Sequence, residues 1–501
     1  MVKKVFLFLS LISTISFAQT LATSKKSSKK ATPNSSLTNL PLEKKGPTLQ
    51  LSPKAAADMI LSQGIKTREV NYNYQVLTLK PYEALSAYDW KVSLESGFEK
   101  DRTESFTVYG NDPNIERRKT TFGLTKSFLT GTALSFDYVR TSQKYISPSS
   151  QVPITLDTAT ITLEQALLGN FFGIADRATV NSAEVEYQAN TVLRVNELQN
   201  LVLDTLRQFW NTYVAEENFK ESLASKERYE KLVEVVKRKN SVGYSSPGEF
   251  SQIQAEYETR IQTVKIASVD YLKNMDQLQT LLGIAPGTEI NFVIPTELPP
   301  APKLKDLALE DRRSLVSQRL KVESAKEALR AAKFKKLPTL NLVGKLGDSG
   351  LDDDASLALN QINSGAHPKY YVGLKFQYNF GSDLQSQTEF NRRATFELEQ
   401  ARLDRQRSEE KDKQAQAERK VTSTFAVAQS KKLQKEYREK AIQELTRSYN
   451  QGRTDLAILI DAMNKYFSSE VEYVRSIGDY QIALNEWAAA RDELIPNKET
   501  P

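Results

Sequence analysis

The residues with the clearest chemical potential gather around one predicted turn near the C-terminus. They are Tyr449, Arg453, Asp455 and Asp461, all within the stretch from 447 to 487. A tyrosine or an arginine beside a carboxylate forms a modest, reversible link, worth about 1 kcal/mol when exposed. Carboxylates repeated around a symmetry axis repel one another and attract multivalent cations. The alternative is that Asp455 only caps the next helix and Arg453 is solvated.

No group of residues in the sequence has the composition of an enzyme site. The chain contains no cysteine and a single histidine, His367, in a loop-like Gly-Ala-His-Pro context. The lack of cysteine excludes disulfides, thiolate metal sites and a lipid anchor on an N-terminal cysteine. We find no nucleophile–base set, phosphate-binding loop or metal-ligand cluster. We therefore expect a protein that is not an enzyme and that holds neither a cofactor nor a metal.

Two long helices are predicted to position the residues near the turn. A highly charged helix is expected from Asp383 to about Asn450, and an Asn-Gln-Gly turn follows it. In the next helix, large side chains recur in alternating steps of four and three, with Glu470 as the one polar member. They are Leu459, Met463, Tyr466, Tyr473, Ile477, Tyr480, Leu484 and Trp487. A repeat of 3.5 residues is the seam of a coiled coil, so the two helices should fold back on each other.

The N-terminal sequence predicts export from the cytoplasm. Residues 1–18 have a basic start, an apolar run and a small-x-Ala end, which is the pattern of a signal peptide. Residues 19–50 are rich in Lys and Ser and are expected to be a disordered leader. This tract carries much of the basic surplus behind the net charge of +6, so we expect no nucleic-acid partner. No later stretch has the roughly 18 consecutive apolar residues of a transmembrane helix.

The same order of predicted helices, strands and turns occurs twice in the remaining sequence. Residues 51–285 read as a helix, alternating strand-like runs, a very long helix, a turn at Gly243 and a second helix. A Pro-rich linker is expected at 286–304, a second repeat at 305–495 with its turn at Gly452, and a short tail at 496–501. Each long helix, about 100 Å at 1.5 Å per residue, is too polar for a buried core helix.

The alternating runs predict strands with one apolar and one polar face. In the run from 371 to 380, for example, Val372, Leu374 and Phe376 alternate with polar or small residues. Such strands in an exported chain suit an outer-membrane β-barrel. Few strands per chain cannot close a barrel, so several chains must share one. The alternative is a soluble periplasmic coiled-coil scaffold or adaptor protein with a small β-sandwich.

Three stretches of the chain resemble the TolC family of trimeric outer-membrane efflux and secretion channels. Leu163–Gly169 resembles the family's strand-to-helix entry, and Ala331–Leu342 resembles its second-half passage from helix to strand. Tyr449–Ala462 resembles its periplasmic tip. The order of these stretches and the duplication carry the resemblance over residues 51 to 495.

The resemblance implies a mainly α fold with a membrane β-barrel portion, built from a duplicated repeat of helix, strands and long helix hairpin. The expected assembly is a homotrimer that shares a twelve-stranded barrel and forms an α-helical tunnel. It would lie in the outer membrane and extend into the periplasm. Its expected function is passive export, either efflux of small molecules or type I secretion, together with an inner-membrane transporter and a periplasmic adaptor protein.

The resemblance also assigns roles at the tip. Tyr449 matches the family's latch tyrosine, Glu249 falls at its acidic partner, and Arg453 or Thr454 falls at or beside the arginine position. Asp461 matches one aspartate of an inward-pointing ring. The other ring position is Ile458 in this chain; the ring is then either single or completed by Asp455.

The number of strands departs from the family pattern. The family has two strands in each half, whereas the first half here offers four alternating runs, near 92–98, 121–128, 132–138 and 158–163. The hairpin around Gly131 is either an insertion or a replacement for one of the other strands. The second half offers two runs, at 339–346 and 371–380.

Overall fold

The structure is a computed structural model that describes residues 48–495, except 102–105, 108–109, 112–113, 147–152, 245, 296–297, 301–308 and 380–382. The chain divides into two units, Met1–Gly46 and Pro47–Pro501, and all described residues belong to the second unit. The expected signal peptide at 1–18, most of the leader at 19–50 and the tail at 496–501 therefore lie outside the described residues.

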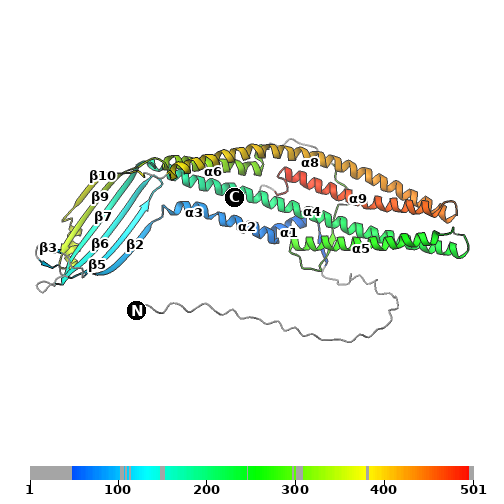
Figure 1. The fold of residues 1–501 in the computed structure, drawn as a ribbon, viewed down its shortest axis with the longest axis horizontal. Helices are drawn as coiled ribbons and strands as arrows, with labels where there is room; N and C mark the ends of the chain where they lie inside the picture. The colour runs from blue at the N-terminus through cyan, green and yellow to red at the C-terminus, as the bar shows by residue number, and fades with distance from the viewer. Residues whose placement is uncertain are drawn as a thin grey trace, which may run out of the picture. The chain divides into compact units, whose positions relative to one another are not determined.

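A six-stranded antiparallel sheet lies at one end of this unit (Figure 1). Its strands are β2 (Lys91–Asp101), β5 (Asn114–Ser127), β6 (Thr132–Ile146), β7 (Pro153–Leu168), β9 (Thr339–Asp352) and β10 (Lys369–Gln377). Their order is β10-β9-β7-β6-β5-β2. A small hairpin, β3 (Phe106–Thr107) and β4 (Gly110–Asn111), connects β2 to β5.

All four alternating runs of the first half are strands of this one sheet. The hairpin around Gly131 therefore replaces none of the other runs, and β5 and β6 lie between β2 and β7. Gly131 has a positive φ of 69°, and a Cβ on it would lie 2.8 Å from the backbone nitrogen of Gly173. Glycine is required there because the turn is left-handed and packs directly on the entry to the next helix.

The register places apolar residues in rows across the whole sheet. One row joins Val92, Leu124, Phe136, Ile161 and Leu346 as direct partners in successive strands. Directly opposed residues lie on the same face, so this face is apolar along that row.

The neighbouring row, on the other face, joins Ser93, Gly123, Asp137, Thr160 and Gly347. The predicted alternation is therefore confirmed. Many of the apolar side chains are exposed; Leu94 is 74% exposed and Val372 is 80% exposed.

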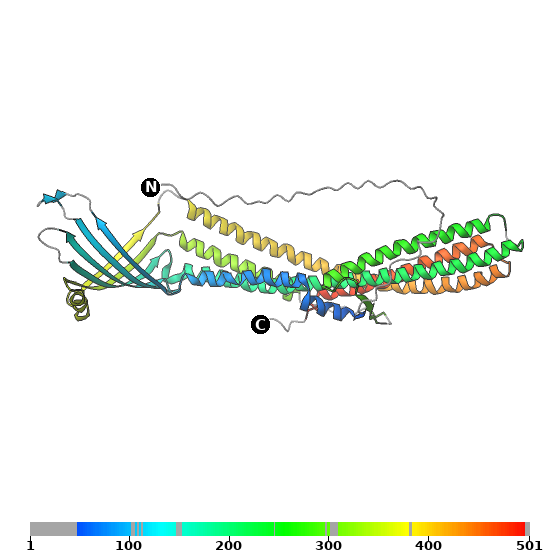
Figure 2. The same ribbon diagram turned by 90° about the horizontal axis from the view of Figure 1, so that it is seen from below.

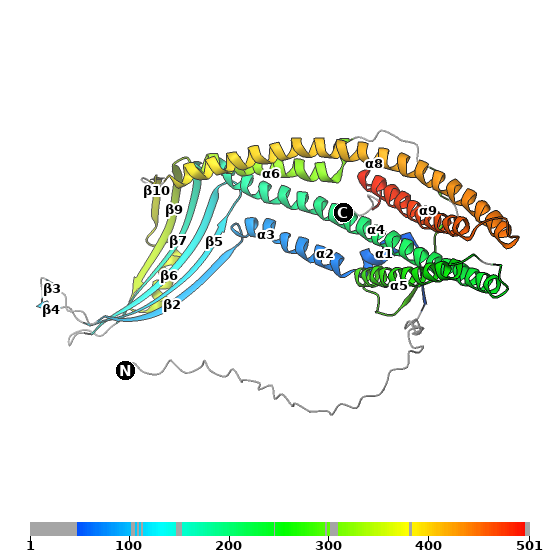
Figure 3. The ribbon, with the colours of Figure 1, turned by 45° about the vertical axis from the view of Figure 1, so that its right-hand side comes forward.

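The helices extend from the sheet and pack along one another (Figures 1 and 3). They are α1 (Pro53–Gln63), α2 (Ile65–Leu77), α3 (Leu79–Ser86), α4 (Ile174–Ser241), α5 (Glu249–Leu282), α6 (Arg313–Lys335), α7 (Ala355–Ser364), α8 (Leu384–Asn450) and α9 (Leu456–Ala490), with 3-10 turns at Phe171–Gly173 and Leu309–Asp311. At 68 residues, α4 is about 100 Å long at 1.5 Å per residue. No helix in the described ranges has an apolar segment long enough to cross a membrane.

Helix starts follow local chemistry. Ser52 caps α1 by accepting a hydrogen bond from the backbone N–H of Ala55. At the start of α4, the Asn170 side chain accepts hydrogen bonds from the backbone N–H groups of Ala175 and Asp176. This fixes the long helix directly at the end of β7.

The structure contains further elements that the sequence did not predict, among them a strand pair and a helix. A parallel strand pair, β1 (Thr48–Leu51) and β8 (Glu289–Phe292), joins the expected leader to the expected Pro-rich linker. It packs on an apolar cluster that includes Phe209 and Leu278. Helix α7 lies between the two predicted runs of the second half, and Asp354 caps it by accepting from the Ser356 N–H.

Candidate functional site

The site lies where the two hairpins, α4–α5 and α8–α9, turn side by side at the end opposite the sheet (Figure 2). The turns contain Gly243 and Gly452, both with positive φ, at 78° and 72°. An apolar cluster holds the two hairpins together. Its buried members are Tyr229, Leu232, Val236, Ile253, Ile442, Tyr449, Leu456, Leu459, Ile460, Met463 and Tyr466. The predicted seam of α9 therefore packs within this cluster near the tip.

Lys239 joins the two tips. It lies in the last turn of α4, and its Nζ donates a 2.6 Å hydrogen bond to the backbone carbonyl of Tyr449, in the last turn of α8. The same Nζ lies 3.7 Å from the centroid of the Tyr449 ring. The ammonium thus makes a cation–π contact and interacts with the negative end of the α8 dipole. Lys239 is the basic group that connects the hairpins here.

The Tyr449 side chain is buried and its hydroxyl has no partner among the described residues. Burial, together with the charge of Glu249, raises the pKa of Tyr449 to about 12. Its phenol is therefore protonated at neutral pH. The contribution of Tyr449 to the tip comes from its ring and its carbonyl, because the hydroxyl makes no described link.

Glu249 is the first residue of α5 and is half-buried near Tyr449. The structure therefore brings Glu249 and Tyr449 into one neighbourhood. Arg453 is exposed, and no ion pair of its side chain is found within the described part of the chain. Thr454 instead bonds across the turn, with its Oγ1 at 2.6 Å from Oγ of Ser448.

Asp455 and Asp461 point to solvent from α9. Asp455 occupies the N-cap position of α9, but its side chain makes no capping hydrogen bond. Asp461 pairs with Lys465 at 2.7 Å on the same helix, and both side chains are exposed. Ile458, the residue at the second ring position, is 52% exposed on the same side of the helix. Ile458 and Asp461 are therefore exposed together on one side of α9.

A second polar cluster joins α4 to α9 farther from the tip. Arg228 of α4 pairs with the buried Glu470 of α9 at 2.5 Å and lies over the ring of Tyr466. Burial and the neighbouring Glu470 raise the pKa of Glu221 to about 6, against the opposing charges of Lys435 and Arg228. Two carboxyl groups and one guanidinium thus share a site that links the hairpins.

Polar anchors also fix the helices nearer the sheet. Arg312 forms a buried ion pair with Glu410 of α8 at 3.1 Å. Its neighbour Arg313 donates to Gln199 of α4 and, through its backbone N–H, to Asp492 after α9. These bonds bring four helices of the two repeats into a fixed relation.

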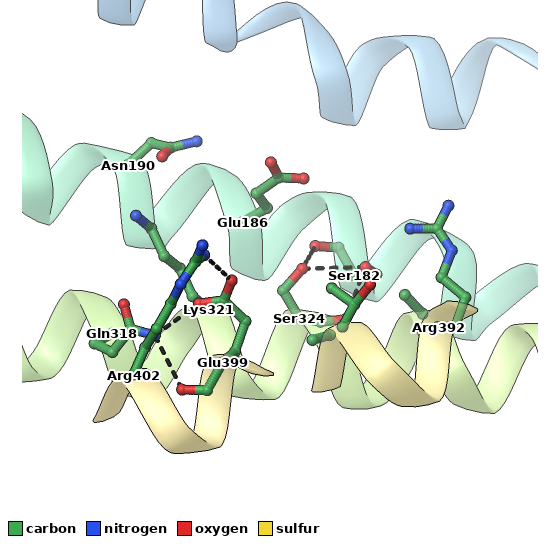
Figure 4. Close-up of a pocket in the computed structure, with 12 residues that line it drawn as sticks. Ser182, Glu186, Asn190, Gln318, Lys321, Ser324, Arg392, Glu399 and Arg402 are labelled. Atoms are coloured by element: carbon green, nitrogen blue, oxygen red, sulfur yellow. Dashed lines mark hydrogen bonds and ion pairs between the residues drawn. The ribbon is translucent and has the colours of Figure 1, made fainter. Parts of the chain in front are cut away.

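A polar groove of about 550 Å³ runs between α4, α6 and α8 (Figure 4). Its labelled lining residues are Ser182, Glu186 and Asn190 of α4, Gln318, Lys321 and Ser324 of α6, and Arg392, Glu399 and Arg402 of α8. Glu399 accepts from Gln318 and Arg402, and Glu186 pairs with Lys80. The carboxylates of this groove are thus engaged in holding helices together.

The described residues contain no group of three or more His, Cys, Asp or Glu side chains that could hold a metal ion. His367 lies in the loop after α7, with its Nδ1 at 3.0 Å from the carbonyl of Ser349. Its environment is that of a loop residue bonded to a strand end.

The sequence analysis missed Lys239. Its signal was present, because a basic residue in the last turn of a helix favours contact with free carbonyls. The sequence could not show which carbonyl accepts the hydrogen bond of Lys239, since that carbonyl belongs to a residue 210 positions away. The same holds for Arg228 and Glu470, which are 242 positions apart.

Comparisons with known proteins give fold relatives only. No protein-family model matches the chain, and no similar sequence is found among curated proteins. The outer-membrane channel OprN matches with a TM-score of 0.67 and 14% identity, over 88% of this chain and 89% of that one. The Campylobacter jejuni CmeC outer membrane channel matches with a TM-score of 0.67 and 12% identity, over 89% and 87%.

The outer membrane protein VceC from Vibrio cholerae matches with a TM-score of 0.64 and 12% identity, over 88% of this chain and 95% of that one. At this identity the likeness shows the fold. The expected fold, mostly helical with a β portion, is confirmed as that of these outer-membrane proteins.

Proposed function

We propose that this chain, which has the channel-tunnel fold of the TolC family, is one protomer of a homotrimeric outer-membrane export channel. It extends from the outer membrane into the periplasm and works with an inner-membrane transporter and a periplasmic adaptor protein. It is a passive conduit rather than an enzyme. Its cargo is either a small molecule in efflux or a polypeptide in type I secretion.

The observation that carries this proposal is the two-faced sheet. Its apolar rows are exposed, and the strands that carry them are up to 16 residues long, which exceeds the roughly 9–11 residues that a tilted strand needs to span a membrane. The opposite face is polar, as the wall of a water-filled channel must be. Lipid is the environment in which the apolar face is favourable, and the polar face then lines a pore.

The tip supports a gate in this channel. Lys239 of the first hairpin contacts the carbonyl and the ring of Tyr449 in the second, with Glu249 nearby, so separating the hairpins breaks the Lys239 contacts. Asp461 is exposed beside Ile458, and three copies of Asp461 around an axis form an acidic ring. In this proposal Asp455 adds to the acidic surface at the rim, and Arg453 is a solvated neighbour.

The alternative, a soluble periplasmic scaffold or adaptor, has less support. It accounts for the long helices, but it leaves the apolar rows of six strands in water. Exposed apolar patches of that size are unfavourable in a soluble protein. The fold relatives are described as outer-membrane channels and an outer membrane protein.

Membrane fractionation and reconstitution test the proposal together. We expect the full chain to co-fractionate with outer membranes, to require detergent for extraction and to migrate as a trimer. In planar bilayers it should conduct ions. A detergent-independent soluble monomer would contradict the channel and favour the scaffold.

A further inference from the structure

We propose that three copies of this chain close an eighteen-stranded barrel in which β2 of each chain pairs with β10 of the next. The inference rests on the proposed function, because it assumes a trimeric membrane channel. It departs from the twelve strands that the family resemblance implies. The reason is the added β5–β6 hairpin, which raises the contribution of each chain from four strands to six.

The added hairpin is an integral part of the sheet. β5 pairs with β2 from Lys91 to Asp101 and with β6 along its full length. β6 in turn pairs with β7 from Thr132 to Lys144. Since both strands are interior, a barrel built from this sheet cannot leave them out. The apolar row from Val92 to Leu346 crosses them without interruption, so along this row β5 and β6 face the same two environments as their neighbours.

The two edges of the sheet suit each other. No strand pairs with the outer edge of β2 or of β10 in the described part of the chain. Every residue of β2 is exposed, as are all residues of β10 except Gly373. Both edges carry apolar side chains, such as Leu94 and Leu374, and an open apolar edge favours pairing with another strand.

The strand directions also agree. Each successive pair in the sheet is antiparallel, so β2 and β10 run in opposite directions. β2 leaves α3 and runs away from the helices, whereas β10 returns toward them and leads to α8 (Figure 3). A second copy can therefore continue the antiparallel ladder across the junction. The occupant of each edge is a copy of this chain.

The width of the sheet matches the helices beneath it. Four helices, α3, α4, α6 and α8, adjoin the sheet ends of β2, β7, β9 and β10. At about 9.5 Å between axes, four helices side by side span about 38 Å. Six strands spaced about 4.8 Å and tilted about 40° also span about 38 Å, whereas four strands span about 25 Å. The added hairpin thus gives the barrel the circumference of the tunnel.

This geometry has a consequence for cargo. Barrel diameter grows roughly linearly with strand number, so eighteen strands give a bore about half as wide again as twelve. The outer end then imposes no narrowing on what the helical tunnel carries. In this proposal the wall of the barrel accepts cargo as wide as the tunnel, and the tip is the constriction that the described residues provide.

The absence of cysteine makes the junction directly testable. We would place one cysteine in β2, Ser93→Cys, and combine it in turn with Tyr371→Cys, Gly373→Cys and Lys375→Cys in β10, all on the polar face. Oxidation of the membrane-inserted protein should give covalent trimers for at least one pair. Each single variant, and Ser135→Cys of interior β6 combined with Lys375→Cys, should give none.

Strand counting in an electron cryomicroscopy map of the detergent-solubilised trimer completes the test. Eighteen strands with β2–β10 junctions support the inference. A conducting trimer with twelve strands, or one in which no β2–β10 pair cross-links, overturns the inference and leaves the channel standing. A chain that neither inserts nor forms trimers overturns the channel proposal as well.

Discussion

At the residue scale, the tip is held by a lysine rather than by the hydroxyl of the tyrosine. Lys239 donates a hydrogen bond to the carbonyl of Tyr449 in the last turn of α8 and lies over the Tyr449 ring. The Tyr449 hydroxyl, in contrast, is buried without a described partner. The resemblance pointed to Tyr449 and Glu249, and the structure places both in one neighbourhood. The basic partner could not be read from sequence, because it lies in the opposite hairpin and depends on how the two hairpins pack.

Replacing Lys239 should therefore loosen the closed tip more than removing the tyrosine hydroxyl. Lys239→Met removes one charge-assisted hydrogen bond and one cation–π contact, together about 1.4 kcal/mol, or a tenfold shift toward the open state per chain. Tyr449→Phe should change little, because the ring and the carbonyl remain. Single-channel recordings measure both; a larger effect from Tyr449→Phe would contradict this assignment.

The acidic ring makes a separate prediction at Asp461. Asp461→Asn should weaken block of the channel by divalent cations added from the periplasmic side, since each chain loses one carboxylate at the tip. Asp479→Asn, an exposed carboxylate farther along α9, is the matched control and should leave the block unchanged. If divalent cations block the Asp461→Asn channel as strongly as the wild-type channel, Asp461 does not belong to a ring.

Glu221 should make stability depend on pH. Its pKa is raised in the folded state to about 6, from an ordinary value of 4.5, so its ionisation is less favourable in the folded chain. Stability is then lost as pH rises from about 4.5 through 6. Glu221→Gln should stabilise the protein at pH 7.5 by about 1 kcal/mol, a value reduced for partial exposure.

Thermal unfolding of the detergent-solubilised protein at pH 4.5 and pH 7.5 measures this effect. The advantage of Glu221→Gln should largely disappear at pH 4.5, where the glutamate is almost fully protonated in the folded state and about half protonated in the unfolded state. A constant difference between the two pH values would show that packing, rather than ionisation, is responsible.

At the element scale, periodicity predicted most of the architecture. The steps of two in the strands and of 3.5 in α9 are set by which faces are apolar, and the sequence carries them directly. The elements that escaped prediction depend on distant partners. β1 and β8 pair across more than 200 residues, and α7 forms where Ala358 packs onto Gly350 of β9. Loop composition alone does not record such partners.

The turn that adds the extra hairpin should be sensitive to a single methyl group. Gly131→Ala puts a Cβ in a left-handed turn and 2.8 Å from the Gly173 nitrogen. Gly452→Ala is the matched control, because it has a similar φ but open space around it. The left-handed conformation alone costs roughly 1–2 kcal/mol in both variants, so any further loss of stability in Gly131→Ala measures the contact.

Urea unfolding of the two variants separates the cost of the left-handed conformation from the cost of the contact with Gly173. We expect Gly131→Ala to be the less stable of the two, with its loss reported by fluorescence or by protease access to the β5–β6 turn. Equal loss in both would mean that the turn can move away from Gly173 without cost.

At the scale of the whole molecule, each chain supplies a six-stranded sheet with two exposed edges, together with a pair of hairpin tips. Periodicity predicted the long helices and the family resemblance implied the tunnel, whereas the count of six strands came from the register. The sequence offered four alternating runs in the first half but could not show that all of them join one sheet.

Removal of the added hairpin should narrow the channel without abolishing it. Deleting residues 112–148 lets β2 connect to β7, which run antiparallel and present the same faces. We expect the shortened trimer to insert and to conduct ions. Its outer mouth should exclude polyethylene glycols of a size that still enters the mouth of the full-length trimer. Polymer-exclusion recordings measure the mouth, and an unchanged cut-off would contradict the wider barrel.

The β5–β6 hairpin also limits how a channel of this kind can change over time. Because β2 leaves the helices and β7 must return to them, strands can be gained or lost within one chain only in pairs. In a three-fold assembly, each such event alters the barrel by six strands at once. Insertion of one hairpin then changes the pore size in a discrete step and requires no change in the helices or in the tip.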